Sequence, residues 1–178
     1  VAKTSWAKKP PSETVRHASF GGGGMAGADL SSISSHPKVT VAAITEIDPG
    51  RRRQIQQRFR NAKVYADWRE MLEKEDLDVV TVATPNHWHT LAAIWAIQAG
   101  KDVYVEKPVS HNVWEGRQLV NAARKHKKIV QTGTQARSSK CIQDAVKWVQ
   151  AGNLGKIKVS WGLCYKRRGS IGDIADTQ

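Results

Sequence analysis

Short apolar runs alternate with longer segments of helical periodicity over most of the chain. The runs predicted as β-strands are Val15–Phe20, Val39–Glu46, Val64–Tyr65, Val79–Ala83, Val103–Glu106 and Ile129–Thr132. The segments predicted as helices are Gly24–Ser35, Arg51–Arg60, Asp67–Glu75, Trp88–Ala99, Asn112–His126 and Lys140–Ala151. Strands that alternate with helices of this length are joined by right-handed crossovers. The pattern therefore predicts an α/β fold with a doubly wound parallel sheet.

Two predicted strands depart from the apolar pattern of a parallel sheet. Val15–Phe20 contains Arg16 and His17, so it is either short or provides partners for both side chains. Ile157–Tyr165 alternates apolar and polar residues, which is typical of a strand covered on one face. That alternation predicts the start of a second, antiparallel α+β domain.

The composition is that of a globular protein. Of 178 residues, 40% are hydrophobic and 25% are charged, which suits one domain, or one and the start of another, and excludes a largely disordered chain. No apolar run approaches the ~18 residues of a membrane-spanning helix, so we expect no membrane partner. Cys141 and Cys164 have no metal-ligand spacing and are too few for a disulfide framework.

A net charge of +12 would attract nucleic acid if the basic residues formed one surface. They fall instead in separate short clusters without interleaved aromatic residues, namely Lys8-Lys9, Arg51–Arg53, Arg124–Lys128 and Lys166–Arg168. We interpret these clusters as solvated helix faces and loops, and expect no nucleic-acid partner.

Four consecutive glycines follow the first predicted strand and open a helix. The spacing G-x-G-x-x-A begins at Gly21, and a second register, G-x-G-x-x-G, begins at Gly22. A dinucleotide pyrophosphate requires a tight turn, a backbone without adjacent side chains and a helix amino terminus, which favours the first register. Taken alone, the motif also suits a flexible linker. The residues predicted to contact a dinucleotide here are Gly21, Gly23, Gly24, Met25 and Ala26.

Glu46 ends the second predicted strand, about 20 residues beyond the glycines, where an acidic residue binds a ribose hydroxyl in dinucleotide-binding folds. A carboxylate at that place disfavours a 2′-phosphate and therefore favours NAD. The nearby Arg51–Arg53 would favour NADP, so NADP stays open.

Two further polar segments follow buried strands, at the sheet edge where ligands bind in open α/β folds. In Thr84–His89 we predict cofactor contacts from Thr84, Asn86 and His87. His87 and His89 would diverge on a starting helix, with no carboxylate or thiolate nearby in sequence, so no metal is predicted.

The second of these segments is Glu106-Lys107-Pro108. Both charged residues are predicted to contact the cofactor, and Lys107 is the candidate catalytic residue because a lysine there donates to a substrate hydroxyl. A Glu–Lys pair in a solvated loop is the alternative for this segment alone.

These segments together resemble one family in their order and spacing. The resemblance rests on Phe20–Ala26, Ile44–Asp48, Thr84–His89, Glu106–Pro108 and Gly155–Ile157. Over roughly Val15 to Gly172 the chain resembles the glucose–fructose oxidoreductase/inositol dehydrogenase (Gfo/Idh/MocA) family of NAD(P)-dependent oxidoreductases.

The resemblance implies a Rossmann domain that binds NAD(H) or NADP(H) and a sugar or polyol as the substrate. It places Lys107 near the nicotinamide, where it orients the substrate hydroxyl, and implies a cis Lys107–Pro108 peptide. It also places Gln131–Arg137 close to the mouth of the active site. The domain division that follows is an arm at 1–14, a dinucleotide-binding Rossmann domain at 15–137, and the linking helix and first strand of a second domain at 138–178.

Relatives in this family continue into a second domain of similar length that carries a His general acid–base with an Asp partner. The chain given ends at Gln178. We therefore expect it to bind dinucleotide and to turn over slowly or not at all, because a placed base typically contributes about 10²–10⁴-fold. Whether the full-length form is a homo-oligomer stays open.

Two other functions suit parts of the sequence. One is a non-catalytic protein that senses NAD(H), and the other, motivated only by net charge, is a nucleic-acid binder. We expect a cytoplasmic location. Export of a longer precursor stays open, because some relatives have a twin-arginine leader.

Overall fold

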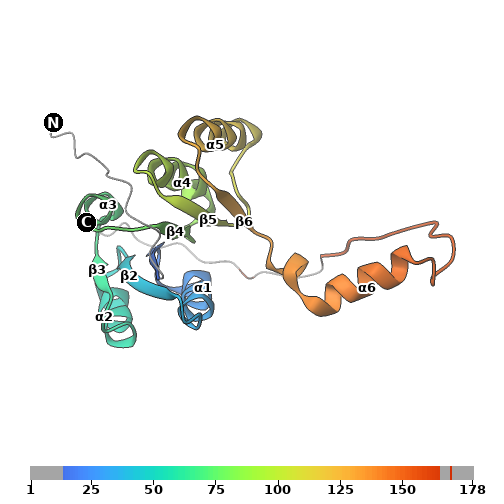
Figure 1. Ribbon diagram of the computed structural model, residues 1–178, viewed down its shortest axis with the longest axis horizontal. Coiled ribbons are helices and arrows are strands. Elements are labelled where there is room, and N and C mark those ends of the chain that lie inside the picture. Colours follow the sequence, from blue (N-terminus) through green and yellow to red (C-terminus); the bar gives the residue numbers. More distant parts are fainter. Residues whose placement is uncertain (1–13, 165–168, 170–178) are drawn as a thin grey trace. The chain divides into compact units, whose positions relative to one another are not determined.

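A computed structural model describes residues 14–164 and Gly169 of the chain. Six parallel strands form one sheet in the order β3-β2-β1-β4-β5-β6 (Figure 1). The strands are β1 (Val15–Phe20), β2 (Val39–Thr45), β3 (Lys63–Tyr65), β4 (Val79–Val82), β5 (Asp102–Glu106) and β6 (Val130–Gly133). This order is that of doubly wound dinucleotide-binding sheets, so the predicted fold class is confirmed.

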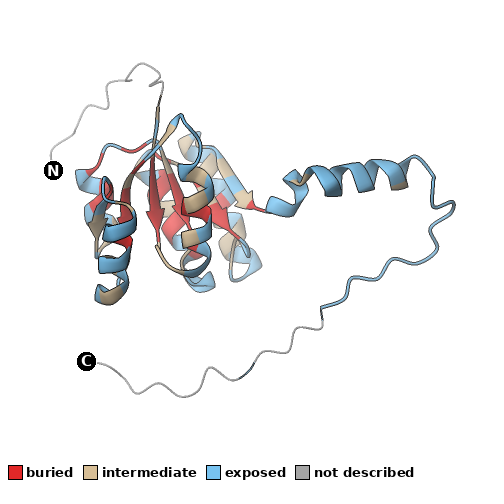
Figure 2. Cartoon of the chain, turned by 90° about the horizontal axis from the view of Figure 1, so that it is seen from below, coloured by how far each residue is buried: buried red, intermediate tan, exposed pale blue. Residues whose placement is uncertain are grey.

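Helices cover both faces of this sheet. They are α1 (Gly24–Ser34), α2 (Pro49–Arg58), α3 (Trp68–Lys74), α4 (His89–Gln98) and α5 (Val113–His126), with a 3-10 turn η1 (Asn86–Trp88) before α4. Helices α1 and α2 lie on one face and α3, α4 and α5 on the other (Figure 1). The strands between them are largely buried, as Figure 2 shows in red.

Two apolar cores correspond to these two layers. The core on the α3–α5 face includes Phe20, Val82 and Val105, and the core on the α1–α2 face includes Ile44 and Ile55. The inner strands β1, β2, β4 and β5 therefore bury side chains on both faces, whereas the edge strands β3 and β6 are only partly buried. Burial on both faces explains why the sequences of β2 and β4 are nearly continuous apolar runs.

The polar strand β1 keeps its full length because its polar side chains find partners. Arg16 donates from its backbone nitrogen to Asp78 Oδ2 (2.7 Å) and from Nε to the carbonyl of Asp76 (2.5 Å). His17 is 1% exposed and its Nε2 lies 2.7 Å from Thr81 Oγ1 on β4. Burial lowers the pKa of His17 to about 4, so the ring is neutral in the folded sheet at neutral pH.

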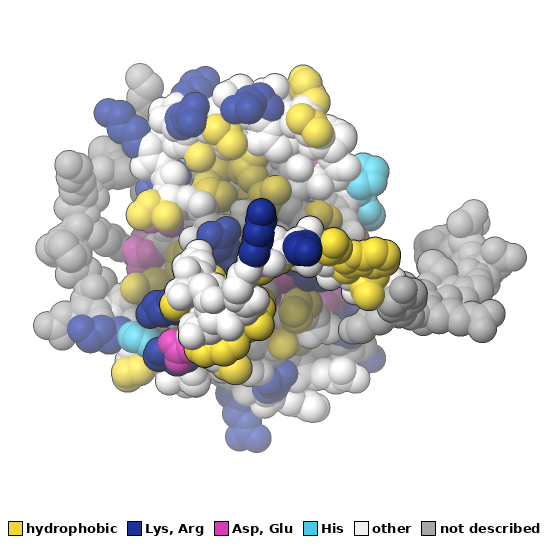
Figure 3. All heavy atoms as spheres, turned by 90° about the vertical axis from the view of Figure 1, so that its right-hand side faces the viewer, with side chains coloured by type: hydrophobic (Ala, Val, Ile, Leu, Met, Phe, Trp, Pro, Cys, Tyr) yellow, Lys and Arg dark blue, Asp and Glu magenta, His cyan; other side chains and the backbone are white. Residues whose placement is uncertain are grey.

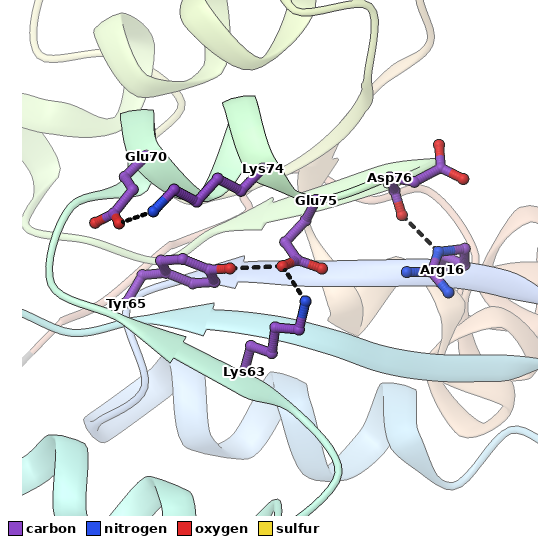
Figure 4. Close-up of polar contacts among 7 residues, drawn as sticks. All are labelled: Arg16, Lys63, Tyr65, Glu70, Lys74, Glu75 and Asp76. Atoms are coloured by element: carbon purple, nitrogen blue, oxygen red, sulfur yellow. Dashed lines mark hydrogen bonds and ion pairs between the residues drawn. The ribbon is translucent and has the colours of Figure 1, made fainter.

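A buried carboxylate fastens the edge strand β3 to the end of α3 (Figure 4). Glu75 Oε1 accepts hydrogen bonds from Lys63 Nζ (2.8 Å) and Tyr65 Oη (2.5 Å). Burial opposes ionisation of Glu75, but these two bonds, together with the charges of Lys63 and Arg16, outweigh it and lower the pKa of that carboxyl. The Tyr65 carbonyl in turn accepts from the Glu46 backbone nitrogen (3.0 Å), so this edge fixes the start of the loop after β2.

The chain divides into two compact units between Gln135 and Ala136. The second unit contains α6 (Lys140–Gln150), preceded by a 3-10 turn η2 (Gln135–Ser138) that spans the division. Ile142, Val146 and Trp148 on α6 are each about half exposed.

The strand predicted over Ile157–Tyr165 is wrong where the structure describes it. Residues 157–164 have no strand hydrogen bonding and are exposed throughout, and Tyr165 lies outside the described residues. An extended segment becomes a strand only when a neighbouring strand accepts and donates its backbone hydrogen bonds, and no described strand pairs with these residues. The predicted arm at 1–14, apart from Thr14, also lies outside the described residues.

On the face drawn in Figure 3, the Lys and Arg side chains of the described residues lie in several separate places among uncharged ones. The predicted clusters Lys8-Lys9 and Lys166–Arg168 lie outside the described residues. Within the described ranges, no helix combines the length and apolarity that crossing a membrane requires.

Candidate dinucleotide-binding site

All the predicted site segments leave the sheet at one edge, the carboxyl ends of the strands. Phe20 is in register with Thr45 on β2 and Val82 on β4, and Val82 is in register with Val105 on β5. The next residues along each strand therefore lie side by side. The order of strands reverses between β1 and β4, which is where open α/β sheets form their ligand crevice.

The glycine loop makes a tight turn from β1 into α1. Gly21 has φ +97°, and a Cβ there would lie 3.1 Å from the Ala83 carbonyl oxygen, so the backbones of two strand ends meet closely at this point. Ala26 is fully buried and packs against Gly21. This geometry favours the register that begins at Gly21 over the one that begins at Gly22.

The amino terminus of α1 is open beside the loop. Gly23 caps α1 without a side-chain hydrogen bond, and the first helical turn has no acidic residue. A Cβ at Gly24 would meet nothing within 4 Å, and Met25 is 49% exposed. The free backbone N–H groups of the first turn and the helix dipole together suit an anion such as a pyrophosphate.

Glu46 is buried beside the same loop, at 8% exposure. Its carboxylate accepts from the Gly22 backbone nitrogen (3.4 Å) and from the Asp48 backbone nitrogen (3.2 Å). Two arginines of the Arg51–Arg53 cluster make different contacts. Arg52 donates to the carbonyls of Glu46 and Ile47, whereas the Arg51 guanidinium lies next to Gly23.

The segment after β4 presents both exposed and buried polar groups. Asn86 and His87 are exposed on the 3-10 turn. Thr84 Oγ1 is buried and finds no hydrogen-bond partner among the described residues, although a buried hydroxyl normally has one. A hydroxyl left without a partner at this edge is one that a bound ligand can satisfy.

His89 links the loops after β4 and β5, a role that the sequence did not indicate. The ring is 2% exposed, and its Nε2 lies 2.7 Å from the Thr84 carbonyl while its Nδ1 lies 2.6 Å from the Pro108 carbonyl. Carbonyl oxygens only accept, so the His89 ring supplies the donors of this link.

Glu106 and Lys107, at the end of β5, differ in exposure to solvent. Glu106 is 3% exposed, and its carboxylate accepts from the Lys107 backbone nitrogen (3.1 Å) and from Gln135 Nε2. Lys107 is exposed, and the Lys107–Pro108 peptide is cis, as the family resemblance implies. Glu106 therefore holds the turn that presents Lys107, whereas the lysine itself is accessible.

Asp29 and Tyr104 interact electrostatically with Glu106 and were not among the predicted site residues. Asp29 belongs to the buried stripe of α1 with Ala26 and Leu30. The i, i+3, i+4 spacing of these three residues is a signal that the sequence does contain, because an acid on an apolar stripe is one that the fold buries.

The residues present fit a dinucleotide. Four features lie along one edge of the sheet. They are a helix amino terminus without a side-chain cap, a glycine loop that is open at Gly24, the Glu46 carboxylate after β2 and the Thr84 hydroxyl after β4. Among the described residues, no three His, Cys, Asp or Glu side chains gather as a metal site. The fold and this edge define a dinucleotide-binding domain of the Rossmann class.

Comparison with known proteins specifies the family. Residues 15–134 match the family described as an oxidoreductase family with an NAD-binding Rossmann fold, GFO_IDH_MocA. The chain belongs to this family, and the matched segment is its NAD-binding domain. Levoglucosan dehydrogenase of Pseudarthrobacter phenanthrenivorans is 30% identical over 64% of this chain and 29% of its own length. Inositol 2-dehydrogenase of Salmonella paratyphi B is 27% identical over 71% of this chain and 38% of its own length.

Solved structures agree with the fold. The WlbA dehydrogenase of Chromobacterium violaceum, crystallised with NADH and UDP-GlcNAcA, has a TM-score of 0.75 and 27% identity over 81% of this chain and 42% of its own. The scyllo-inositol dehydrogenase of Lactobacillus casei, with NAD(H) and scyllo-inositol, has a TM-score of 0.74 at 22% identity and is similar in fold. The chain thus spans less than half the length of these relatives.

Proposed function

We propose that the chain supplies the cofactor-binding part of an oxidoreductase that transfers a hydride between NAD and a hydroxyl-bearing carbon of a sugar or polyol. The observation that carries this proposal is the meeting of the glycine loop, Glu46 and Lys107 at one sheet edge, within the segment that matches the family. The similar levoglucosan and inositol dehydrogenases support a sugar or polyol as the substrate class.

Each site residue has a role in this proposal. The N–H groups of the first turn of α1, with Gly21 and Gly23, hold the pyrophosphate, and Met25 and Ala26 shape the wall beside it. Glu46 accepts hydrogen bonds from the adenosine ribose, and its charge disfavours a 2′-phosphate. The buried orientation of Glu46 toward the glycine loop supports NAD as the preferred cofactor.

At the other end of the edge, the residues orient the reacting groups. NAD, when bound, would supply the hydride acceptor for the carbinol carbon of the substrate. Thr84, Asn86 and His87 line the approach to the nicotinamide, and Thr84 Oγ1 gains the partner that it lacks. Lys107 donates to the substrate hydroxyl and fixes its distance from the nicotinamide, while Glu106 holds the Lys107 backbone.

We also propose that residues 138–178 belong to a second domain. The division of the chain between Gln135 and Ala136 and the half-exposed apolar side chains of α6 support this assignment.

The test is a calorimetric titration of the purified, folded chain with NADH and with NADPH. We expect saturable binding of NADH at one site per chain and weaker binding of NADPH, with ADP-ribose competing for the same site. A chain that is folded by circular dichroism and produces no binding heat with either cofactor would overturn the proposal. A Lys107→Met variant that binds NADH normally would agree with the assignment of Lys107 to the substrate.

A further inference from the structure

One face of α2 lies along the glycine loop and brings a positive charge to it. Arg51, Ile55 and Arg58 follow one another at intervals of about one helical turn, so their side chains share that face. Ile55 is buried, and a Cβ at Gly22 would collide with its side chain, so the isoleucine packs directly against the loop backbone. One turn earlier, a Cβ at Gly23 would lie 3.4 Å from Arg51 Nη1 and 3.8 Å from Arg51 Cζ. The packing of Ile55 therefore fixes the helix face that presents Arg51 to Gly23.

Hydrogen bonds also fix the start of α2. Glu46 Oε1 accepts from the Asp48 backbone nitrogen (3.2 Å). Asp48 Oδ1 in turn accepts from the Arg51 backbone nitrogen (2.7 Å), which caps α2. The acidic residue that we assign to the ribose thus orders the turn that precedes Arg51. The backbone of Arg51 is held by this cap on one side and by the packing of Ile55 on the other.

The guanidinium of Arg51 has no polar partner among the described residues, unlike two other arginines of α2. Arg52 donates to two carbonyls of the loop after β2, and Arg58 donates to Ser31 Oγ. Both carboxylate oxygens of Glu46 accept backbone N–H groups. The ion pairs within the described part of the chain involve other basic residues, namely Lys63, Arg69, Lys74 and Lys140. Arg51 is therefore available to an anion that comes from outside the chain.

The place of Arg51 defines which part of a dinucleotide it can reach. In a G-x-G-x-x-A loop the second glycine is the point where the main chain approaches the pyrophosphate, because no side chain separates them. Gly23 is that glycine in the register that begins at Gly21. The first turn of α1 contains no acidic residue. Arg51 therefore adds a full positive charge beside Gly23 to the partial positive charge of the helix terminus, and guanidinium groups bind phosphate oxygens through paired hydrogen bonds.

We propose that Arg51 binds the pyrophosphate of the dinucleotide and so strengthens the binding of NAD and NADP by the same factor. The inference rests on the proposed function, because it requires a dinucleotide on the glycine loop. It assigns Arg51 to the part that the two cofactors share, and not to the 2′-phosphate that distinguishes them. The preference between the two cofactors then depends on Glu46.

The test compares Arg51→Gln with the wild type in calorimetric titrations with NADH, NADPH and ADP-ribose. ADP-ribose retains the pyrophosphate and lacks the nicotinamide. We expect all three ligands to bind about tenfold more weakly to Arg51→Gln, because a charge-assisted hydrogen bond is lost in each complex. The ratio of the NADH and NADPH dissociation constants should equal that of the wild type. Arg51 is exposed, so the variant should fold, and circular dichroism checks this.

Two further variants isolate the charge at this position. Arg53→Gln is the matched control, because it removes the same charge from an exposed residue of α2 that lies beside Gln56 and Val64. Residues two apart on a helix do not share a face, so we expect this control to bind all three ligands as the wild type does. Arg51→Lys retains the charge without the flat guanidinium, and it should bind them more tightly than Arg51→Gln.

The outcomes separate this inference from the proposed function. Weaker binding of NADPH alone would place Arg51 at the 2′-phosphate and overturn the inference. An equal loss in Arg53→Gln would reduce the effect to general electrostatic attraction and overturn it too, as would equal affinities of Arg51→Lys and Arg51→Gln. Unchanged binding of all three ligands to Arg51→Gln overturns the inference and leaves the proposed function standing. Failure of the folded wild-type chain to bind any of them overturns both.

Discussion

Acid sensitivity of the fold should depend on one buried ring, His17. The folded state lowers the pKa of His17 from 6.5 to about 4 through burial. Between those pH values His17 binds a proton in the unfolded chain but not in the folded chain. The resulting contribution to the free energy of unfolding is therefore complete above pH 6.5 and is lost as the pH falls toward 4. A pKa difference of about 2.5 corresponds to about 3 kcal/mol of lost unfolding free energy.

The perturbation that tests this is His17→Gln, whose amide reaches Thr81 Oγ1 without titrating. At pH 8 we expect a modest loss of about 1 kcal/mol from imperfect packing. Between pH 7 and pH 4.5 the free energy of unfolding of the variant should fall by about 2–3 kcal/mol less than that of the wild type.

Urea unfolding at each pH provides the measurement, with tryptophan fluorescence as the signal because Trp68 and Trp95 stack in the first unit at 4.3 Å between ring centroids. His111→Gln is the control, since His111 is exposed. Parallel stability curves for the wild type and His17→Gln would refute the argument.

Three further changes test the site. A Cβ at Gly23 approaches only Arg51, at 3.4 Å or more, so Gly23→Ala should leave thermal unfolding nearly unchanged while weakening NADH binding at least about tenfold in calorimetry. The control Gly162→Ala, at an open position, should change neither the thermal unfolding nor the NADH affinity. Unimpaired NADH affinity in Gly23→Ala would contradict the assigned pyrophosphate loop. Glu46→Gln should reduce the preference for NADH over NADPH about tenfold, and an unchanged ratio of the two dissociation constants would remove Glu46 from the ribose site. His89→Leu leaves two buried carbonyls without donors and should cost about 2–4 kcal/mol in urea unfolding, with His89→Gln intermediate; equal stability of all three proteins would show that the link between the two loops contributes nothing.

The sheet and its helices were predictable because the inner strands are buried on both faces and helical segments separate them along the chain. Glu46 and Lys107 could be anticipated as well, since a residue that directly follows a buried parallel strand has to emerge at the ligand-binding edge. The partners of Arg16 and His17 could not, because they come from residues about 60 positions away that only the completed sheet brings near.

One error comes from a missing neighbour. The alternation in Ile157–Tyr165 describes a residue pattern, but strand formation also depends on a pairing partner that the pattern does not identify. The burial of Asp29, in contrast, could have been predicted, because its spacing with Ala26 and Leu30 places it on the apolar stripe of α1.

The placement of every proposed ligand contact at the carboxyl edge of the sheet leaves the amino edge available for engineering. The turns at His36–Lys38 and at Lys127-Lys128 connect helices to strands at that far edge, and both turns include exposed residues. A cysteine introduced there, after replacement of the exposed Cys141 and Cys164, would carry a dye or a surface tether at the edge of the sheet opposite the proposed cofactor contacts. Nucleotide binding to such an immobilised or labelled chain could be measured without steric interference from the tether or the dye.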